Sequence, residues 1–358
     1  MLVIRLRLVG DVVFTTPVLR ALRRTWPDAH LTYLVEQAAA PIVAHNPQLD
    51  DVIVLGRERG LARVRADVRT GRRLRQARFD VVLDLHGGPR AALLTWLSRA
   101  PRRIGYSGQG RGWAYTEQVH RPPELRPRHS VVNQWDILSP LVPSLPPPDP
   151  RVDAVEMAEH DASAARISEW MSSTDLTPPR IAIVVHVSAG NAFRRWPLSS
   201  FVELAVRLSS SSPERRIILT SGPSEADAAD EVARQAQVRL PDQPDAVRTC
   251  GDTTLDELRA LIARAALYIG GDSGPLHMAA TTCTPIVGLF GPTLPVRSAP
   301  WRDPACVTES VEVEGLACRP CDQRVCLPGD FRCLTQIGVD AVVAASERAL
   351  ARAGRSPT

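Results

Sequence analysis

The chain has 358 residues and a formal net charge of +4, with 44% hydrophobic and 23% charged residues. This length exceeds what one ordinary core organises, so two domains are expected. The composition is typical of a globular protein, and no apolar stretch reaches a membrane-spanning length. The opening MLVIRLRLVGDVVF does not read as a signal peptide, because Arg5, Arg7 and Asp11 interrupt its apolar run. These features favour a cytoplasmic protein.

The basic charge is concentrated in the first half of the chain. Every residue in the Lys+Arg total is Arg, and residues 1–150 hold 22 Arg against 13 acids, whereas the remainder holds 21 against 26. A basic half indicates an acidic partner such as phosphorylated lipid, a membrane face or nucleic acid. The Arg-rich segment 57–78 is either part of such a surface or a solvated helix. It contains no aromatic residue for stacking on bases, so nucleic acid is not the expected partner.

Strand and helix patterns alternate through the first half. Helical spacing begins at Pro17, and a second helix is predicted over 57–78. This alternation predicts an α/β fold with a parallel sheet covered by helices. The predicted strands are residues 2–7, 30–36, 51–55 and 79–88.

A Pro-rich stretch, residues 139–150, then interrupts the alternation and is predicted to be a linker. A helix is predicted over 153–172, and strands follow. Two α/β domains joined in this way predict a cleft between them, with ligands beyond the carboxyl ends of the strands. The predicted strands of the second half are residues 180–190, 216–222, 246–251, 267–271 and 285–291.

The first candidate turn reads RLVGDVVFTTP and places Asp11 after a strand. A dinucleotide-binding turn would need G-x-G-x-x-G, and only one Gly is present, which disfavours an NAD enzyme. A carboxylate at the carboxyl edge of a sheet suits a general base for a bound hydroxyl. The alternative is an Asp that only caps the next helix.

The second candidate turn reads HVSAGNAFRRWP. Its small residues, Ser188 and Ala189, allow a close approach of the backbone to a ligand. Arg194 and Arg195 follow, and a guanidinium there suits the charge that develops on a diphosphate leaving group. The alternative is a solvent-facing pair formed by Arg194 and Arg195.

The third candidate turn reads GGDSGPLH. Ser273 and Gly274 would supply the first free N–H groups of a helix, which form a phosphate site. Asp272 suits sugar hydroxyls, and His277, one turn later, suits a phosphate or a ribose. The alternative is ordinary strand-to-helix turn chemistry.

Together, the stretches IRLRLVGDVVFTTPVLRALRRTWP, HVSAGNAFRRWP and GGDSGPLHMAATTCTPIVGLFGPT resemble the three signatures of the heptosyltransferases of lipopolysaccharide core synthesis, glycosyltransferase family 9. The resemblance implies a GT-B fold, with two Rossmann-like doubly wound domains facing a central cleft. It implies that residues 1–150 bind the acceptor, that residues 151–340 bind the nucleotide sugar, and that residues 341–358 form a C-terminal helix and tail. It also implies inverting transfer of a heptose from ADP-heptose, with no metal or cofactor required.

The resemblance also assigns site residues. Asp11 corresponds to the general base, and Arg194 lies where the family usually has a Lys that contacts the diphosphate. Arg keeps the charge but changes its geometry. Val187 and Ser188 stand where a Pro-Gly pair is common, which puts backbone contacts to the nucleotide in question. The implied donor-binding residues are Ser188, Ala189, Glu225, Asp272, Ser273, Gly274 and His277.

The implied partners are an ADP-sugar donor, a phosphorylated glycolipid acceptor and a peripheral contact with the inner membrane face. A close alternative keeps the fold and chemistry but uses another nucleotide-sugar donor, or an O-antigen or protein acceptor. A non-catalytic nucleic-acid-binding protein is a different class. A nucleotide-sugar epimerase would need acid and base residues around the second carbon of the sugar.

Seven cysteines are present, and four of them share the segment CRPCDQRVCLPGDFRC. The first pair of its C-x2-C-x4-C-x6-C spacing is typical of a tetrahedral thiolate site for structural Zn or Fe. Members of the family often carry a similar segment. The alternatives are reduced thiols or a local disulfide. Cys250, Cys283 and Cys306 are expected to be buried apolar residues, and the candidate metal ligands are Cys318, Cys321, Cys326 and Cys333.

Overall fold

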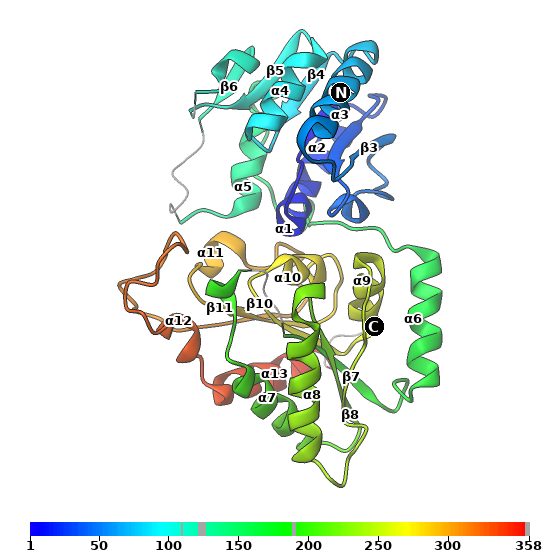
Figure 1. Ribbon diagram of the computed structural model, residues 1–358, viewed down its shortest axis with the longest axis vertical. Coiled ribbons are helices and arrows are strands. Elements are labelled where there is room, and N and C mark those ends of the chain that lie inside the picture. The colour runs from blue at the N-terminus through cyan, green and yellow to red at the C-terminus, as the bar shows by residue number, and fades with distance from the viewer. Residues whose placement is uncertain (109, 121–126, 188–190, 355–358) are drawn as a thin grey trace. The chain divides into compact units, whose positions relative to one another are not determined.

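The computed structural model describes residues 1–108, 110–120, 127–187 and 191–354 (Figure 1). The chain forms two compact units, Met1–Ala158 and Glu159–Thr358, and each contains one six-stranded sheet. All strand pairs in both sheets are parallel. This confirms the predicted α/β class.

The first unit has the strand order β3-β2-β1-β4-β5-β6. The chain leaves β1 in one direction along the sheet and returns to β4 on its other side, so the connecting helices cover both faces. The strands are β1 (Leu2–Ile4), β2 (Thr32–Glu36), β3 (Asp51–Leu55), β4 (Val81–Asp84), β5 (Arg102–Tyr106) and β6 (Glu117–Val119). The helices are α1 (Val9–Val13), α2 (Thr16–Thr25), α3 (Gly60–Gln76), α4 (Pro89–Ser98) and α5 (Ser130–Trp135), with 3-10 turns η1 (Ala40–Ile42), η2 (Gly112–Ala114) and η3 (Asp136–Leu138).

The second unit repeats this topology, with the order β12-β11-β10-β7-β8-β9. Its strands are β7 (Ile181–His186), β8 (Arg215–Thr220), β9 (Val247–Thr249), β10 (Leu267–Gly271), β11 (Ile286–Phe290) and β12 (Thr308–Glu312). Its helices are α6 (Asp161–Ser173), α7 (Leu198–Ser210), α8 (Ala226–Val238), α9 (Leu255–Arg264), α10 (Gly274–Ala279), α11 (Pro295–Ser298), α12 (Arg332–Thr335) and α13 (Val339–Ala353), with 3-10 turns η4 (Ala192–Arg194) and η5 (Pro223–Glu225).

The central strands are buried on both faces, as their unbroken apolar sequences predict. Every residue of β1, β4, β10 and β11 is buried. Alternate side chains point to opposite faces, so Leu2 and Ile4 join Leu34 in one cluster. Each sheet reverses its strand order next to its first strand, between β1 and β4 and between β7 and β10. Ligands bind at these switch points in doubly wound sheets.

The predicted strands at residues 51–55 and 267–271 have the predicted bounds. The predicted strand at 2–7 is shorter and ends at Ile4, and Leu8, with a φ of 39°, directly precedes α1. Strands β5, β6 and β12 were not predicted. Both β6 (EQV) and β12 (TESVE) lie at sheet edges and are too polar to show an apolar run. Among the described helices, none has both the length and the apolar character needed to cross a bilayer.

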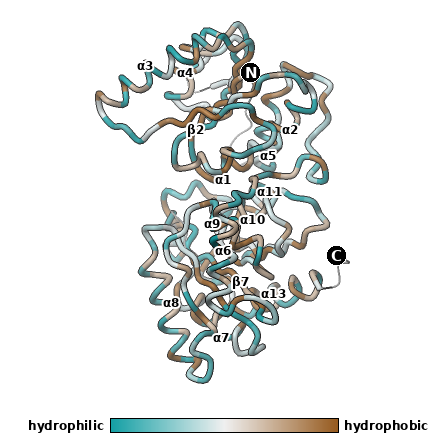
Figure 2. The backbone as a smooth tube through the Cα atoms, turned by 90° about the vertical axis from the view of Figure 1, so that its right-hand side faces the viewer, coloured by the Kyte–Doolittle hydropathy of each residue, from teal (hydrophilic) through white to brown (hydrophobic). Residues whose placement is uncertain are grey.

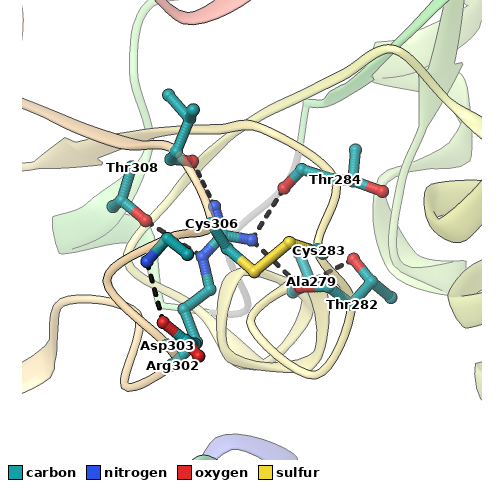
Figure 3. The surroundings of a disulfide bond; sticks show 10 residues. Ala279, Thr282, Cys283, Thr284, Arg302, Asp303, Cys306 and Thr308 are labelled. Carbon is teal, nitrogen blue, oxygen red and sulfur yellow. Dashed lines mark hydrogen bonds between the residues drawn. A yellow bond between two sulfur atoms is a disulfide. The ribbon is translucent and has the colours of Figure 1, made fainter. Parts of the chain in front are cut away.

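The prediction for Cys283 and Cys306 is wrong, because the two form a disulfide with Cα atoms 5.1 Å apart (Figure 3). The bond joins the segment before β11 to the segment before β12, and Cys283 is exposed. Arg302 lies beside it and donates to the carbonyls of Thr282 at 3.0 Å and Thr284 at 2.7 Å. Burial lowers the pKa of Arg302 to about 10. The disulfide and this buried guanidinium both hold the edge strand β12 to the sheet.

We expect Cys283→Ser combined with Cys306→Ser to lower the free energy of unfolding. The cysteines are 23 residues apart, and closing a loop of this length stabilises a fold by about 3 kcal/mol. Denaturant unfolding with and without reductant measures the effect. Reductant should destabilise the parent protein and a Cys326→Ser control, and leave the double variant unchanged. Equal sensitivity of all three proteins would contradict the prediction.

Candidate active site

Asp11 lies at the switch point of the first sheet, in the first turn of α1. Its Oδ2 is 2.5 Å from Nη2 of Arg5, which directly follows β1. Arg5 also donates through Nη1 to the carbonyl of Leu85, directly after β4, at 2.6 Å. The Arg5 side chain is only 7% exposed, whereas that of Asp11 is 34% exposed. A buried cation therefore fixes a carboxylate that solvent, or a ligand, can reach.

A second carboxylate, Asp84, ends β4 and is fully buried. Its Oδ1 accepts from the backbone N–H groups of His86 at 2.9 Å and Gly87 at 2.8 Å. Its Oδ2 accepts from the hydroxyl of Tyr115 at 2.7 Å. Burial raises the pKa of Asp84, although these hydrogen bonds oppose the rise. Sequence analysis missed this residue, and an acid inside the apolar run VVLDL was the available signal.

Asp272 is the centre of the candidate site in the second unit, directly after β10, and is 2% exposed. Its Oδ2 accepts from the hydroxyl of Thr293, and its Oδ1 lies 3.3 Å from Nε2 of His277. Arg194 Nη1 lies 3.3 Å from Oδ2 and donates to the backbone carbonyl of Asp272 at 2.9 Å. Burial alone would raise the pKa of Asp272, but His277, Arg194 and Thr293 outweigh it and hold the pKa at about 2. The carboxylate is therefore ionised and already partnered.

Arg194 is held from its other side by Gln323, in the cysteine-rich segment. Gln323 Oε1 accepts from Arg194 Nε at 2.7 Å and from Asn191 Nδ2 at 3.0 Å. The rings of Phe193 and Phe331 meet edge to face at 5.3 Å and join the same two segments. Sequence analysis missed Gln323, because it is 129 residues away from Arg194 along the chain. The cysteine-rich segment thus helps to orient a predicted catalytic residue.

The turn after Asp272 keeps a free polar group. The hydroxyl of Ser273 is buried and has no hydrogen-bond partner within the described part of the chain. Gly274 begins α10, with Pro275 in its first turn, and His277 lies one turn later. The structure thus brings Arg194, Asp272, Ser273 and His277 together. A guanidinium, a free hydroxyl and a helix start are groups that bind phosphate.

The other predicted donor-binding residues lie elsewhere. Glu225 is buried in η5 after β8, where its carboxylate accepts from Arg195 Nη2 and from the Ser224 hydroxyl, both at 2.8 Å. Ser188 and Ala189 are outside the described residues. Arg195 is thus ion-paired to Glu225, but its side chain is 48% exposed and faces solvent, as the alternative expected. Arg194 departs from that alternative, because it contacts Asp272.

The predicted Zn or Fe site is not supported. Cys318, Cys321, Cys326 and Cys333 are free thiols, and no group of three or more His, Cys, Asp or Glu side chains within residues 1–108, 110–120, 127–187 and 191–354 is arranged to hold a metal ion. Burial raises the pKa of Cys333, although Arg319 opposes the rise. The segment is anchored in another way, since Arg319 donates to the carbonyl of Thr293 at 2.7 Å.

Known proteins resemble this chain in sequence and in fold. The family described as glycosyltransferase family 9 (heptosyltransferase) matches residues 68–328. Lipopolysaccharide heptosyltransferase 3 of Escherichia coli is 28% identical over 305 residues, which cover 83% of this chain and 85% of that protein. Two solved structures have the same fold along nearly their whole length. One is a family 9 glycosyl transferase from Veillonella parvula, with a TM-score of 0.83 and 23% sequence identity, and the match covers 98% of this chain and 96% of that one. The other is E. coli ADP-heptose lps heptosyltransferase II, with a TM-score of 0.78 and 20% sequence identity, and the match covers 99% of each chain.

The fold is therefore GT-B, as the sequence predicted, and the protein is a glycosyltransferase. Because the family match spans most of the sequence, the chain belongs to glycosyltransferase family 9, the heptosyltransferase family.

We expect Asp272→Asn to lower the free energy of unfolding at neutral pH, and by less as the pH falls. The pKa of Asp272 is depressed from 3.8 to about 2, so its ionised form stabilises the fold above pH 3.8. That stabilisation disappears as the pH falls through about 2. Denaturant unfolding across this range measures the difference between parent and variant. The exposed control Asp242→Asn should show no such trend, and a constant difference for Asp272→Asn would refute the prediction.

Proposed function

We propose that this protein is an inverting heptosyltransferase that transfers a heptose from ADP-heptose to a lipopolysaccharide core acceptor. Membership of family 9 and the similarity to lipopolysaccharide heptosyltransferase 3 support heptose transfer. The similarity to an ADP-heptose lps heptosyltransferase supports the donor. The observation that carries the proposal is the buried Asp272, which holds Arg194 beside the unpartnered hydroxyl of Ser273.

In this proposal the second unit binds the donor, through the part of it that lies within residues 151–340. Arg194 neutralises the negative charge that builds on the departing ADP, and fixed charges aimed at a leaving group are among the largest contributions to catalysis. Ser273 and Gly274 bind phosphate oxygens through the hydroxyl and the N–H groups at the start of α10. Asp272 orients the site and accepts from sugar hydroxyls. The remaining donor contacts are assigned to Ser188, Ala189, Glu225 and His277.

The first unit, within residues 1–150, binds the acceptor. Asp11 accepts the proton of the acceptor hydroxyl as its oxygen attacks the anomeric carbon and the bond to the ADP oxygen breaks. A single displacement inverts the configuration at that carbon. General base catalysis contributes roughly 10²–10⁴-fold. Arg5 is a positioning residue for this carboxylate, and no step is assigned to a metal ion or cofactor.

Calorimetric titration with ADP, GDP, UDP, ADP-heptose and a short RNA tests the donor assignment. Selective binding of ADP and ADP-heptose is the expected result. Preference for GDP or UDP would replace the donor and keep the glycosyltransferase chemistry. An O-antigen or protein acceptor would be revealed by transfer assays with acceptor panels. Binding of RNA alone would overturn the proposed function.

We expect Asp11→Asn to lower turnover by about two to four orders of magnitude, because the amide cannot accept the proton. The affinity of the variant for ADP-heptose should stay within about twofold of that of the parent protein. The proposed donor site lies in the second unit, and a substitution at a solvent-accessible position of the first unit has little effect on stability. Steady-state kinetics and calorimetry measure the two effects. The matched control is Asp28→Asn, an exposed acid of the same unit, which should keep full turnover. Normal turnover of Asp11→Asn would remove the base assignment.

A further inference from the structure

Helix α3 exposes a stripe of aliphatic side chains. Leu61, Val64 and Val68 are 76%, 58% and 42% exposed. Their spacing of three and four residues places them along one side of the helix. Exposed aliphatic side chains that occur singly need no explanation, but three that line up along one side of a helix are typical of an interaction surface.

Unpaired arginines flank this stripe. Arg65, Arg69 and Arg72 follow the same side of the helix and line a shallow groove with Val64, Val68 and one carboxylate, Glu58. The side chains of these three arginines make no hydrogen bond or ion pair to a described residue, and neither do those of Arg57 and Arg59 just before the helix. We call Leu61, Val64, Arg65, Val68, Arg69 and Arg72 the α3 face.

Two further arginines of α3 are paired. Arg63 lies 4.0 Å from Asp67, and Arg73 lies 3.3 Å from Asp51. Between residues 57 and 78 the sequence has nine Arg against two acids, so pairing leaves a large excess of positive charge. That excess lies on the α3 face, on the turn before it, and at Arg75 and Arg78 near the C-terminal end of the helix.

The opposite side of α3 is firmly packed. Asp67, Gly71 and Leu74 are buried, and the absence of a side chain at Gly71 leaves room for Leu97 of α4. Arg90 of α4 lies 2.7 Å from Asp67. Figure 2 shows α3 and α4 together on one side of the first unit. The α3 face therefore belongs to a helix whose opposite side is packed against α4.

We propose that the α3 face docks on an anionic lipid bilayer. The aliphatic stripe enters the interface while the arginines contact lipid phosphates, as in interfacial amphipathic helices. Each arginine near an anionic membrane strengthens binding by a factor of about five. The docking locates the membrane contact expected from the sequence, and it does not depend on which sugar the enzyme transfers.

Charge disfavours the other occupants of this surface. A second copy of the chain, paired by two-fold symmetry, would set Arg65, Arg69 and Arg72 against the same residues. Nucleic acid would use aromatic side chains for stacking, and α3 has none. An aliphatic stripe between guanidinium groups matches lipid, which offers apolar chains beneath phosphates.

Sedimentation with lipid vesicles tests the proposal on the full chain. We expect binding to vesicles of equal parts phosphatidylcholine and phosphatidylglycerol, and little binding to pure phosphatidylcholine. Combining Arg65→Gln, Arg69→Gln and Arg72→Gln should weaken binding about a hundredfold. High salt screens the charges but leaves the apolar contacts, so some binding of the parent protein should persist at high salt. A variant that combines Leu61→Ser, Val64→Ser and Val68→Ser should lose this salt-resistant binding.

The matched control removes three exposed arginines from the second unit, Arg166→Gln, Arg234→Gln and Arg239→Gln, and should bind like the parent protein. Equal losses in both arginine variants would show that net charge alone binds the vesicles, and would overturn the proposal. Three other results would also overturn the proposal. They are equal binding to neutral and anionic vesicles, tighter binding to a short RNA than to vesicles, and a dimer of the parent protein that dissociates in the α3 variants. The vesicles contain neither donor nor acceptor, so failure here and failure of the proposed transfer are separate results.

Discussion

The candidate site of the second unit depends on one buried carboxylate, Asp272. An ionised carboxylate away from water costs several kcal/mol unless charges and hydrogen bonds offset that cost. Asp272 contacts His277 in α10, Thr293 after β11 and Arg194 before α7. These contacts fix three segments of the chain around the turn that follows β10. Removing any partner leaves the charge under-compensated. The turn is consequently organised before a ligand arrives, which spares the ligand the cost of ordering it.

The two units share one topology, and each has an ion pair at its switch point, but the buried partner is a cation in the first unit and a carboxylate in the second. At the first switch point the cation, Arg5, is buried and the carboxylate, Asp11, reaches solvent. At the second, Asp272 is buried and Arg194 keeps 29% of its side chain exposed. Each ion pair therefore presents a different partner outward. An outward carboxylate suits proton transfer, and an outward guanidinium suits a phosphorylated ligand.

The sequence was sufficient for what is local or apolar. Central strands such as β10 are unbroken apolar runs, and Asp272, Ser273 and His277 lie within six consecutive residues, so their meeting was predictable. Contacts between distant segments were not predictable. The pairing of Arg194 with Gln323, of Asp272 with Thr293 and of Cys283 with Cys306 each needs the tertiary fold. The polar edge strands β6 and β12 lack the apolar pattern by which strands are recognised.

The cysteine-rich segment has a consequence for recombination between relatives. Its Gln323 accepts from both Asn191 and Arg194, so the segment and the turn before α7 share one hydrogen-bonded junction. The two pieces are far apart in the sequence, so a chimera keeps this junction only where it preserves Gln323 together with Asn191 and Arg194.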